Sequence, residues 1–151
     1  MHVETSAERS GELVAALVDV WERSVRATHG FLSEDDVAGL RPEVEPGVAG
    51  VSELAVARGE DGAPIGFAGV QDGKLEMLFV APESRGRGVG SALLAHAVER
   101  FGARTLDVNE QNPQAVGFYE HEGFVVEGRS PVDDAGRPWP LLHMRLRRAV
   151  R

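Results

Sequence analysis

The sequence contains no cysteine, so the chain forms no disulfide and has no thiol nucleophile. It also lacks an apolar run of about 18 residues, the length that a bilayer-spanning helix needs. No basic segment followed by an apolar stretch opens the chain, and we therefore expect no signal peptide. Histidines and carboxylates do not recur at metal-ligand spacing. These absences favour a cytoplasmic protein with no membrane segment and no metal site.

Positive charge is scarce relative to negative charge. The formal net charge is −8 at pH 7, which leaves no broad basic surface to displace counterions from nucleic acid. We therefore expect no nucleic-acid partner. With 151 residues, 42% of them hydrophobic, the chain has the size and composition of one domain, spanning residues 1–151.

The most informative stretch is the glycine-rich segment RGRGVG at 85–90. Before it, Leu75, Met77 and Phe79 alternate along an expected strand, and after it apolar residues recur at helical spacing. Its glycines would let a ligand approach the helix's first turn, whose free N–H groups favour an anion. The segment lacks the lysine of a P-loop and the spacing of GxGxxG. We therefore predict a phosphate or pyrophosphate ligand other than a nucleoside triphosphate or NAD.

Turn and cap residues predict the helices and strands of the first half of the chain. After a short strand, TSAE at 5–8 has capping-box spacing and predicts the start of a first helix. SEDD at 33–36 begins a second helix, which we expect to stop near Pro42 and to be followed by a loop at 43–50. The next runs predict an antiparallel meander of three strands, at 53–58, 64–71 and 74–80.

The second half contains a helix after the glycines, a strand at 104–109, and a helix with Asn112 as N-cap and Gly123 as stop. Two strands, at 124–129 and 139–146, complete the chain. The expected fold is α/β (α+β), with a mixed, mostly antiparallel sheet of about 6–7 strands flanked by about four helices.

Two motifs in this order resemble those of the GNAT superfamily of N-acetyltransferases. Its acyl-CoA pyrophosphate loop, Q/R-x-x-G-x-G/A, is matched by Arg85, Gly88 and Gly90. Its second element, an asparagine followed by an alanine and an aromatic pair before Gly-Phe, is matched by Asn112, Ala115, Phe118, Tyr119, Gly123 and Phe124. The segments RSVRATHGFL, DVNEQNPQAVGFYEHEGF and GRSPVDDAGRPWPLLH also resemble the YjaB-like branch of small bacterial members. The resemblance covers the whole chain.

The resemblance implies that acetyl-CoA is the cofactor and that two parallel strands, 75–80 and 104–109, splay apart to receive its pantetheine arm. Backbone N–H groups near Leu78 or Phe79 would then polarise the thioester carbonyl. Asn112 has two compatible roles, as a helix cap and as a cofactor contact. The cofactor-binding residues expected on this basis are Leu78, Phe79, Val80, Arg85, Gly86, Arg87, Gly88, Val89, Gly90, Ser91, Asn112 and Tyr119.

The same resemblance makes Tyr119 the general acid that protonates the leaving thiolate. The alternative is a ring that only packs at a helix edge. The acceptor must also lose a proton, because an alkylamine with a pKa of about 10.4 is almost fully protonated at pH 7. Glu76, on the face opposite to Leu75 and Met77, is the expected base acting through water, and a solvated surface residue is the alternative. The remaining candidates for the base are His29, His121 and His143.

The acceptor pocket is expected between the end of the first helix and the last strand. Its expected lining consists of Trp21, Ser24, Thr28, His29, Phe31 and Trp139. We predict direct transfer, in a ternary complex, to a primary amine of a small molecule. Two alternatives remain, a peptide or protein amine and a non-catalytic acyl-CoA sensor, and a homodimer stays open as the assembly.

Overall fold

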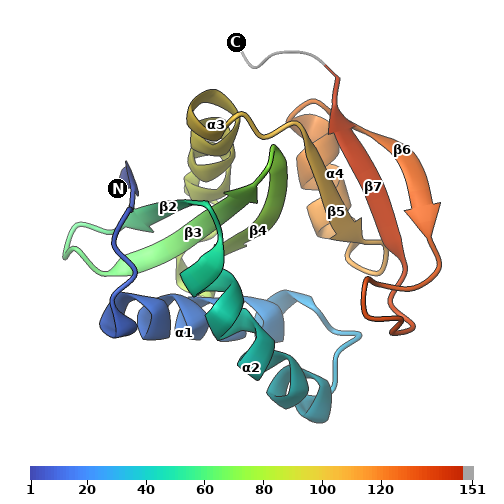
Figure 1. The fold of residues 1–151 in the computed structure, drawn as a ribbon, viewed down its shortest axis with the longest axis horizontal. Coiled ribbons are helices and arrows are strands. Elements are labelled where there is room, and N and C mark those ends of the chain that lie inside the picture. Colours follow the sequence, from blue (N-terminus) through green and yellow to red (C-terminus); the bar gives the residue numbers. More distant parts are fainter. Residues whose placement is uncertain (148–151) are drawn as a thin grey trace.

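The computed structural model describes residues 1–147 as a seven-stranded sheet with helices on both faces (Figure 1). In chain order the elements are β1 (His2–Thr5), α1 (Gly11–Thr28), α2 (Glu34–Gly50), β2 (Glu53–Arg58), β3 (Pro64–Gln71), β4 (Lys74–Val80), the 3-10 helix η1 (Pro82–Ser84), α3 (Val89–Phe101), β5 (Thr105–Asn109), α4 (Pro113–His121), β6 (Phe124–Ser130) and β7 (Leu141–Leu146). The strand order is β1-β2-β3-β4-β5-β7-β6, and only the pair β4–β5 is parallel. The predicted fold class and the meander are therefore confirmed.

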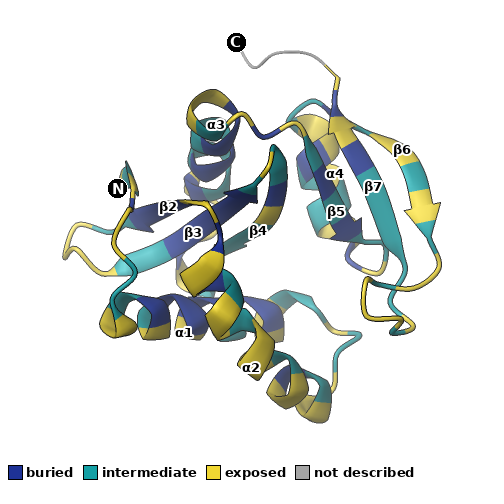
Figure 2. Ribbon diagram, viewed as in Figure 1, coloured by how far each residue is buried: buried dark blue, intermediate teal, exposed yellow. Residues whose placement is uncertain are grey.

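The sheet separates two hydrophobic cores, and the buried residues of the chain are dark blue on the ribbon of Figure 2. One core lies against α3 and α4 and includes Leu93, Leu106 and Met144. The other lies under α1 and α2 and includes Leu17 and Phe67. Because burying large aliphatic and aromatic side chains contributes about 1.5–3 kcal/mol each, both helix pairs are held firmly to the sheet that carries the site.

The first helix begins later than the sequence predicts. Residues 5–8 do not cap it: Thr5 is the last residue of β1, which pairs with β2. Ser10 is the N-cap instead, and its hydroxyl accepts a hydrogen bond from the Leu13 N–H at 3.1 Å. The capping-box spacing at 5–8 was misleading because β1 completes the ladder along the edge of β2, and this pairing is invisible in the local sequence.

The predicted end of the second helix near Pro42 and the loop at 43–50 are both wrong. The capping box of Ser33 and Asp36 begins α2 as expected, but the helix continues to Gly50 with Pro42 and Pro46 inside it. Both prolines lie on the exposed face, where water can reach the carbonyls that lose a partner. On the opposite face Val48 is fully buried against the core under α1, which stabilises the helix past the prolines.

Strand β4 contains a β-bulge that the alternating sequence hides. Val70 of β3 lies opposite Leu75, while Gly69 lies opposite Met77, so Glu76 is the extra residue. Leu75 consequently packs in the core of α3 and α4, whereas Met77 packs on the α1 and α2 side. The expectation that Leu75, Met77 and Phe79 share one face is therefore wrong.

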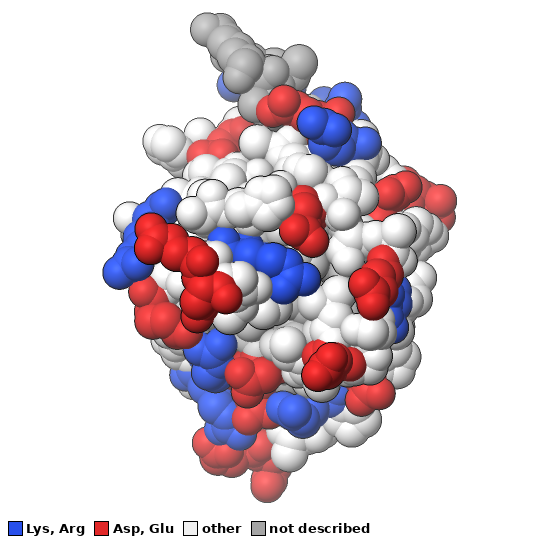
Figure 3. All heavy atoms as spheres, turned by 90° about the vertical axis from the view of Figure 1, so that its left-hand side faces the viewer, with Lys and Arg blue, Asp and Glu red and all other residues white. Residues whose placement is uncertain are grey.

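The charged surface is mixed on the side of the molecule shown in Figure 3. Acidic and basic side chains are interspersed there, with no continuous basic stripe on that face. Arg58 and Glu4 form an ion pair at 3.5 Å. Among residues 1–147, no helix is both long and apolar enough to cross a membrane.

Gly69 allows the bulge to pack, and this can be tested by adding one methyl group. A Cβ at this position would lie 2.9 Å from Met77 Cγ and 3.2 Å from Val51 Cγ1. We expect Gly69→Ala to lower the free energy of unfolding by about 1–3 kcal/mol through overpacking. The matched control is Gly39→Ala on the exposed face of α2, where a Cβ meets no atom within 4 Å. It should raise stability by up to about 1 kcal/mol. Urea denaturation measures both, and equal effects would contradict the packing explanation.

Candidate active site

A cleft opens where the parallel strands β4 and β5 separate. They pair only at Lys74–Thr105 and Leu75–Leu106, and beyond these two pairs the strands diverge (Figure 1). The cleft between them has a volume of about 440 Å³ and is lined by residues 75–80 of β4 and 106–109 of β5. Backbone groups that face the cleft from β4 have no partner on β5, so an extended ligand with amide groups can pair with them. The predicted splay is thus present.

The glycine-rich segment and the start of α3 form one end of this cleft. Gly86 and Gly88 have positive φ angles of 74° and 78°, the left-handed conformation that glycine adopts without strain. Gly88 is the N-cap of α3 and provides no side-chain acceptor for the first turn. The N–H groups of the next three residues therefore remain free for an anion. The residues of this segment that line the cleft are Arg85, Gly86, Gly88, Val89, Gly90 and Ser91.

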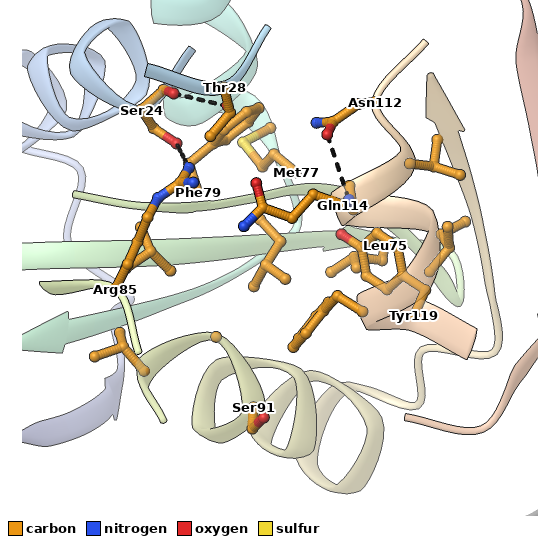
Figure 4. Close-up of a pocket in the computed structure, with 18 of the residues that line it drawn as sticks. Ser24, Thr28, Leu75, Met77, Phe79, Arg85, Ser91, Asn112, Gln114 and Tyr119 are labelled. Carbon is orange, nitrogen blue, oxygen red and sulfur yellow. Dashed lines mark hydrogen bonds between the residues drawn. The ribbon is translucent and has the colours of Figure 1, made fainter. Parts of the chain in front are cut away.

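The two arginines of the segment differ in position. Arg85 lines the cleft, and its Nη2 donates a hydrogen bond to Ser24 Oγ at 3.4 Å (Figure 4). Partial burial lowers the pKa of Arg85 from its ordinary value, and among residues 1–147 no carboxylate lies within ion-pair distance of it. A partly desolvated cation beside free N–H groups fits a pyrophosphate. Arg87 is exposed and does not line the cleft.

Helix α4 forms the opposite wall. Asn112 is 7% exposed and caps the helix, its Oδ1 accepting a hydrogen bond from the Ala115 N–H at 3.3 Å (Figure 4). The predicted cap is confirmed, and the same residue also lines the cleft. Tyr119 is 8% exposed and lines the cleft next to Phe118, whose ring centroid is 5.2 Å away. Burial raises the pKa of Tyr119, so its phenol stays protonated and can donate a proton but not accept one.

A second pocket of about 480 Å³ adjoins the cleft on the side of α1 and α2. It is lined by four of the residues expected around the acceptor, Trp21, His29, Phe31 and Trp139, and Phe31 and Trp139 meet edge to face at 6.4 Å. The other two expected residues do not line it. Ser24 and Thr28 line the cofactor cleft instead, and the Thr28 hydroxyl donates to the Ser24 carbonyl at 2.8 Å.

Six residues line both cavities and mark where they meet. They are His29, Leu75, Glu76, Phe79, Asp107 and Asn109. Glu76, the expected base, is exposed at this junction. Burial, together with the nearby Arg85, lowers the pKa of His29 to about 4, so His29 is neutral at pH 7 and only a weak base. His121 is exposed and lines neither cavity.

Asp107 is the residue at this junction that the sequence reasoning missed. Its Oδ2 accepts a hydrogen bond from Lys74 Nζ at 2.7 Å, and its Oδ1 lies 2.6 Å from His143 Nδ1. His143 Nε2 lies 2.6 Å from Ser130 Oγ. These contacts lower the pKa of Asp107 despite its partial burial. Alternation along TLDVN could have identified it, because Leu106 and Val108 are both buried and Asp107 must face the other way. In the described residues, no three His, Asp or Glu side chains are arranged to hold a metal ion.

A sheet with one splayed parallel pair, a glycine-capped helix at one end of the splay and a buried tyrosine beside it define an acetyltransferase of the GNAT type. Residues 33–147 match the family described as acetyltransferase (GNAT) domain, and the chain belongs to this family. Its members transfer the acetyl group of acetyl-CoA, and this chain is an acetyl-CoA-dependent N-acetyltransferase.

Similar proteins show to which branch of the GNAT family the chain belongs. The chain is 44% identical over 149 residues to the peptidyl-lysine N-acetyltransferase YjaB of Escherichia coli K12, covering 94% of each chain. It is 41% identical over 147 residues to YjaB of Salmonella typhimurium LT2, covering 95% of this chain and 97% of the relative. The solution structure of the apo form of YjaB from Escherichia coli superposes with a TM-score of 0.84 at 42% identity, covering 97% of this chain and 98% of that one. The predicted YjaB-like branch is confirmed.

The anion site at the start of α3 can be tested with a pair of glutamate substitutions. Gly88→Glu places a carboxylate beside the free N–H groups of α3, and we expect it to abolish the rise in melting temperature that CoA produces. The control is Gly62→Glu in the β2–β3 turn, where φ is 84° and a Cβ also meets no atom within 4 Å. Both variants carry the same backbone strain, so only the first should lose the CoA effect. A CoA-stabilised Gly88→Glu protein would contradict the assignment.

Proposed function

We propose that this chain acetylates the side-chain amine of lysine in a peptide or protein. From the sequence alone, a peptide or protein amine is an alternative acceptor. Here it replaces the small-molecule amine as the main hypothesis. Relatives that are 41% and 44% identical over nearly their whole length are named peptidyl-lysine N-acetyltransferases, and this supports a lysine acceptor. The observation that carries the proposal is the acidic, aromatic-lined acceptor pocket, which meets the cofactor cleft at Glu76 and Asp107.

The charge of the acceptor pocket suits an ammonium group. Its lining contains five carboxylates and two cations, namely Glu43, Glu76, Asp107, Asp133 and Asp134 against Lys74 and Arg137. Arg137 is already paired, with Asp133 at 3.2 Å and Glu43 at 2.5 Å, and its guanidinium stacks over Trp139 at 5.6 Å. Glu76 and Asp134 are therefore left in excess, and the aromatic rings can pack along the aliphatic part of a lysine or stabilise its charge.

Residues of the cofactor cleft would bind acetyl-CoA and transfer the protons of the reaction. Arg85 and the free N–H groups of α3 would hold the pyrophosphate, and unpaired backbone groups of β4 would hold the pantetheine arm. Bound acetyl-CoA supplies the activated acetyl group. Glu76 would accept the ammonium proton through water, and Tyr119 would donate its phenolic proton to the departing sulfur. Desolvation of Tyr119 keeps that proton in place until a negative charge develops beside it.

The acceptor class is tested by offering lysine peptides and small amines side by side. Release of CoA thiol is followed with acetyl-CoA, a set of lysine peptides, and a set of polyamines and amino sugars. We expect kcat/KM to be highest for a peptide, and mass spectrometry to place the acetyl group on its lysine side chain. A preference for small amines would restore the original hypothesis, and thiol release without any acetylated amine would contradict both.

The proposed role of Tyr119 as a proton donor predicts an effect on turnover but not on cofactor binding. A proton donated to the leaving group acts only in the transition state, so Tyr119→Phe should lower kcat on the order of 10²-fold. The phenylalanine retains the buried ring, and CoA should raise the melting temperature as it does in the parent. Unchanged kcat would return Tyr119 to a packing role, whereas weaker CoA binding at unchanged kcat would make it a cofactor contact.

Trp139 and His29 line the acceptor pocket, and their removal should affect the acceptor more than the cofactor. We expect Trp139→Ala and His29→Ala each to raise the acceptor KM severalfold, because part of the pocket wall is lost. The rise in melting temperature with CoA should remain. The control is His121→Ala, an exposed histidine that lines neither cavity, for which KM should not change. Parent KM values in both pocket variants would rule out this acceptor site.

A further inference from the structure

Lys74 is the only lysine in the chain, and it lies in the acceptor pocket. The other fifteen of the sixteen basic Lys and Arg residues are arginines, which the reaction does not acetylate. Lys74 begins β4, and its side chain is 33% exposed, so the amine is reachable from the pocket. The protein therefore holds one copy of the acceptor group proposed above within its own pocket.

The position of the amine is set by Asp107. Lys74 pairs with Thr105 across the closed end of the splay, and Asp107 follows two residues later on the same face of β5. The distance from Lys74 Nζ to Asp107 Oδ2 is 2.7 Å, and Asp107 lines both the acceptor pocket and the cofactor cleft. The amine is thus held in the acceptor pocket against a residue of the junction at which an acceptor amine would meet the acetyl group.

We propose that Lys74 is a self-acetylation site, modified in the acceptor pocket of its own chain. The inference rests on the proposed lysine acceptor. The Lys74 ammonium loses one proton to Asp107 or to water, Nζ then forms a bond to the acetyl carbon, and the carbon–sulfur bond breaks with its electron pair on sulfur. The sulfur takes a proton from Tyr119 or water, and the nitrogen releases its second proton. An ammonium and a thioester give an amide, a thiol and one proton.

The ion pair makes this reaction slow relative to that of an acceptor peptide. The hydrogen bond and charge of Asp107 raise the pKa of Lys74, so the neutral amine is rarer than in an unpaired lysine. Acetylation removes the positive charge and leaves the Asp107 carboxylate in the pocket without its cation. Each chain accepts one acetyl group at this position, so the reaction stops at one modification per chain at Lys74.

The single lysine makes the test direct. The full chain is incubated with acetyl-CoA and no other acceptor, and is then digested with a protease that cleaves only after lysine. The unmodified chain gives two fragments, 1–74 and 75–151, whereas a chain acetylated at Lys74 remains uncut. We expect progressive loss of cleavage and a gain of one acetyl mass, with a rate per chain that does not change on dilution. Acetylation of the N-terminal amine leaves cleavage unaffected and is thereby distinguished.

Two variants and one binding readout complete the test. Lys74→Arg keeps a cation opposite Asp107 and should gain no acetyl group near residue 74, while Gly88→Glu should remain cleavable because it does not bind the donor. In the absence of acetyl-CoA, bound CoA should slow the chemical acetylation of Lys74 by N-hydroxysuccinimide acetate severalfold, since the amine lies beside the residues that border the cleft. Equal labelling with and without CoA, or equal acetylation of the Gly88→Glu chain by acetyl-CoA, would overturn the inference.

The same reactions separate this inference from the proposed function. Lysine peptides are included in a parallel reaction. If peptides are acetylated and Lys74 remains cleavable, the self-acetylation site is wrong and the peptide function stands. If neither is acetylated, both are wrong. A rate per chain that rises with protein concentration means transfer between copies, and this would also overturn modification within the chain's own pocket.

Discussion

The early end of the parallel pairing between β4 and β5 is the constraint on which the rest of the site depends. The strands share two residue pairs and then separate, and beyond that point β4 still pairs with β3 and β5 with β7. An unpaired backbone group inside a protein costs free energy unless a ligand or water satisfies it. The splay therefore creates both space and hydrogen-bonding groups that suit an extended cofactor, and residues of α3 and α4 line the cleft on either side.

The bulge at Glu76 affects how β4 lines both the cofactor cleft and the acceptor pocket. Because of the extra residue, Leu75 faces the core of α3 and α4, while Met77 faces α1 and α2. Glu76 is left exposed where the cofactor cleft and the acceptor pocket meet. Gly69 on β3 leaves room for the displaced Met77 side chain. A regular β4 would present its side chains strictly by alternation, and Leu75 and Met77 would then share one face.

The electrostatics of the junction are organised around Asp107. It accepts a hydrogen bond from Lys74 and interacts with His143, so three strands, β4, β5 and β7, contribute to one partly buried network. Neighbouring Glu76 and Asp134 add negative charge to the acceptor pocket, while Arg85 adds positive charge in the cofactor cleft. Opposite charges therefore line the two cavities, as the proposed binding of an anionic pyrophosphate in one and a cationic amine in the other requires.

Short sequence patterns determined most of the helices and strands of this protein. Contacts between distant segments decided how these helices and strands form the site. The bounds of β2, β3 and β4, the capping box at Ser33 and the cap at Asn112 follow from alternation and turn chemistry over a few residues, and the structure agrees with them. The glycine spacing likewise predicts an anion site at the start of α3 from neighbouring residues alone. By contrast, the first helix begins after β1 because β1 pairs with a strand some fifty residues away, and α2 continues through two prolines because Val48 is buried under α1. The bulge in β4, the position of Asp107 and the placing of Ser24 and Thr28 in the cofactor cleft also depend on which strands and helices become neighbours. Caps, turns and strand periodicity are short-range properties of the chain, whereas register and cavities arise from packing between distant segments, and only the folded structure brings those segments together.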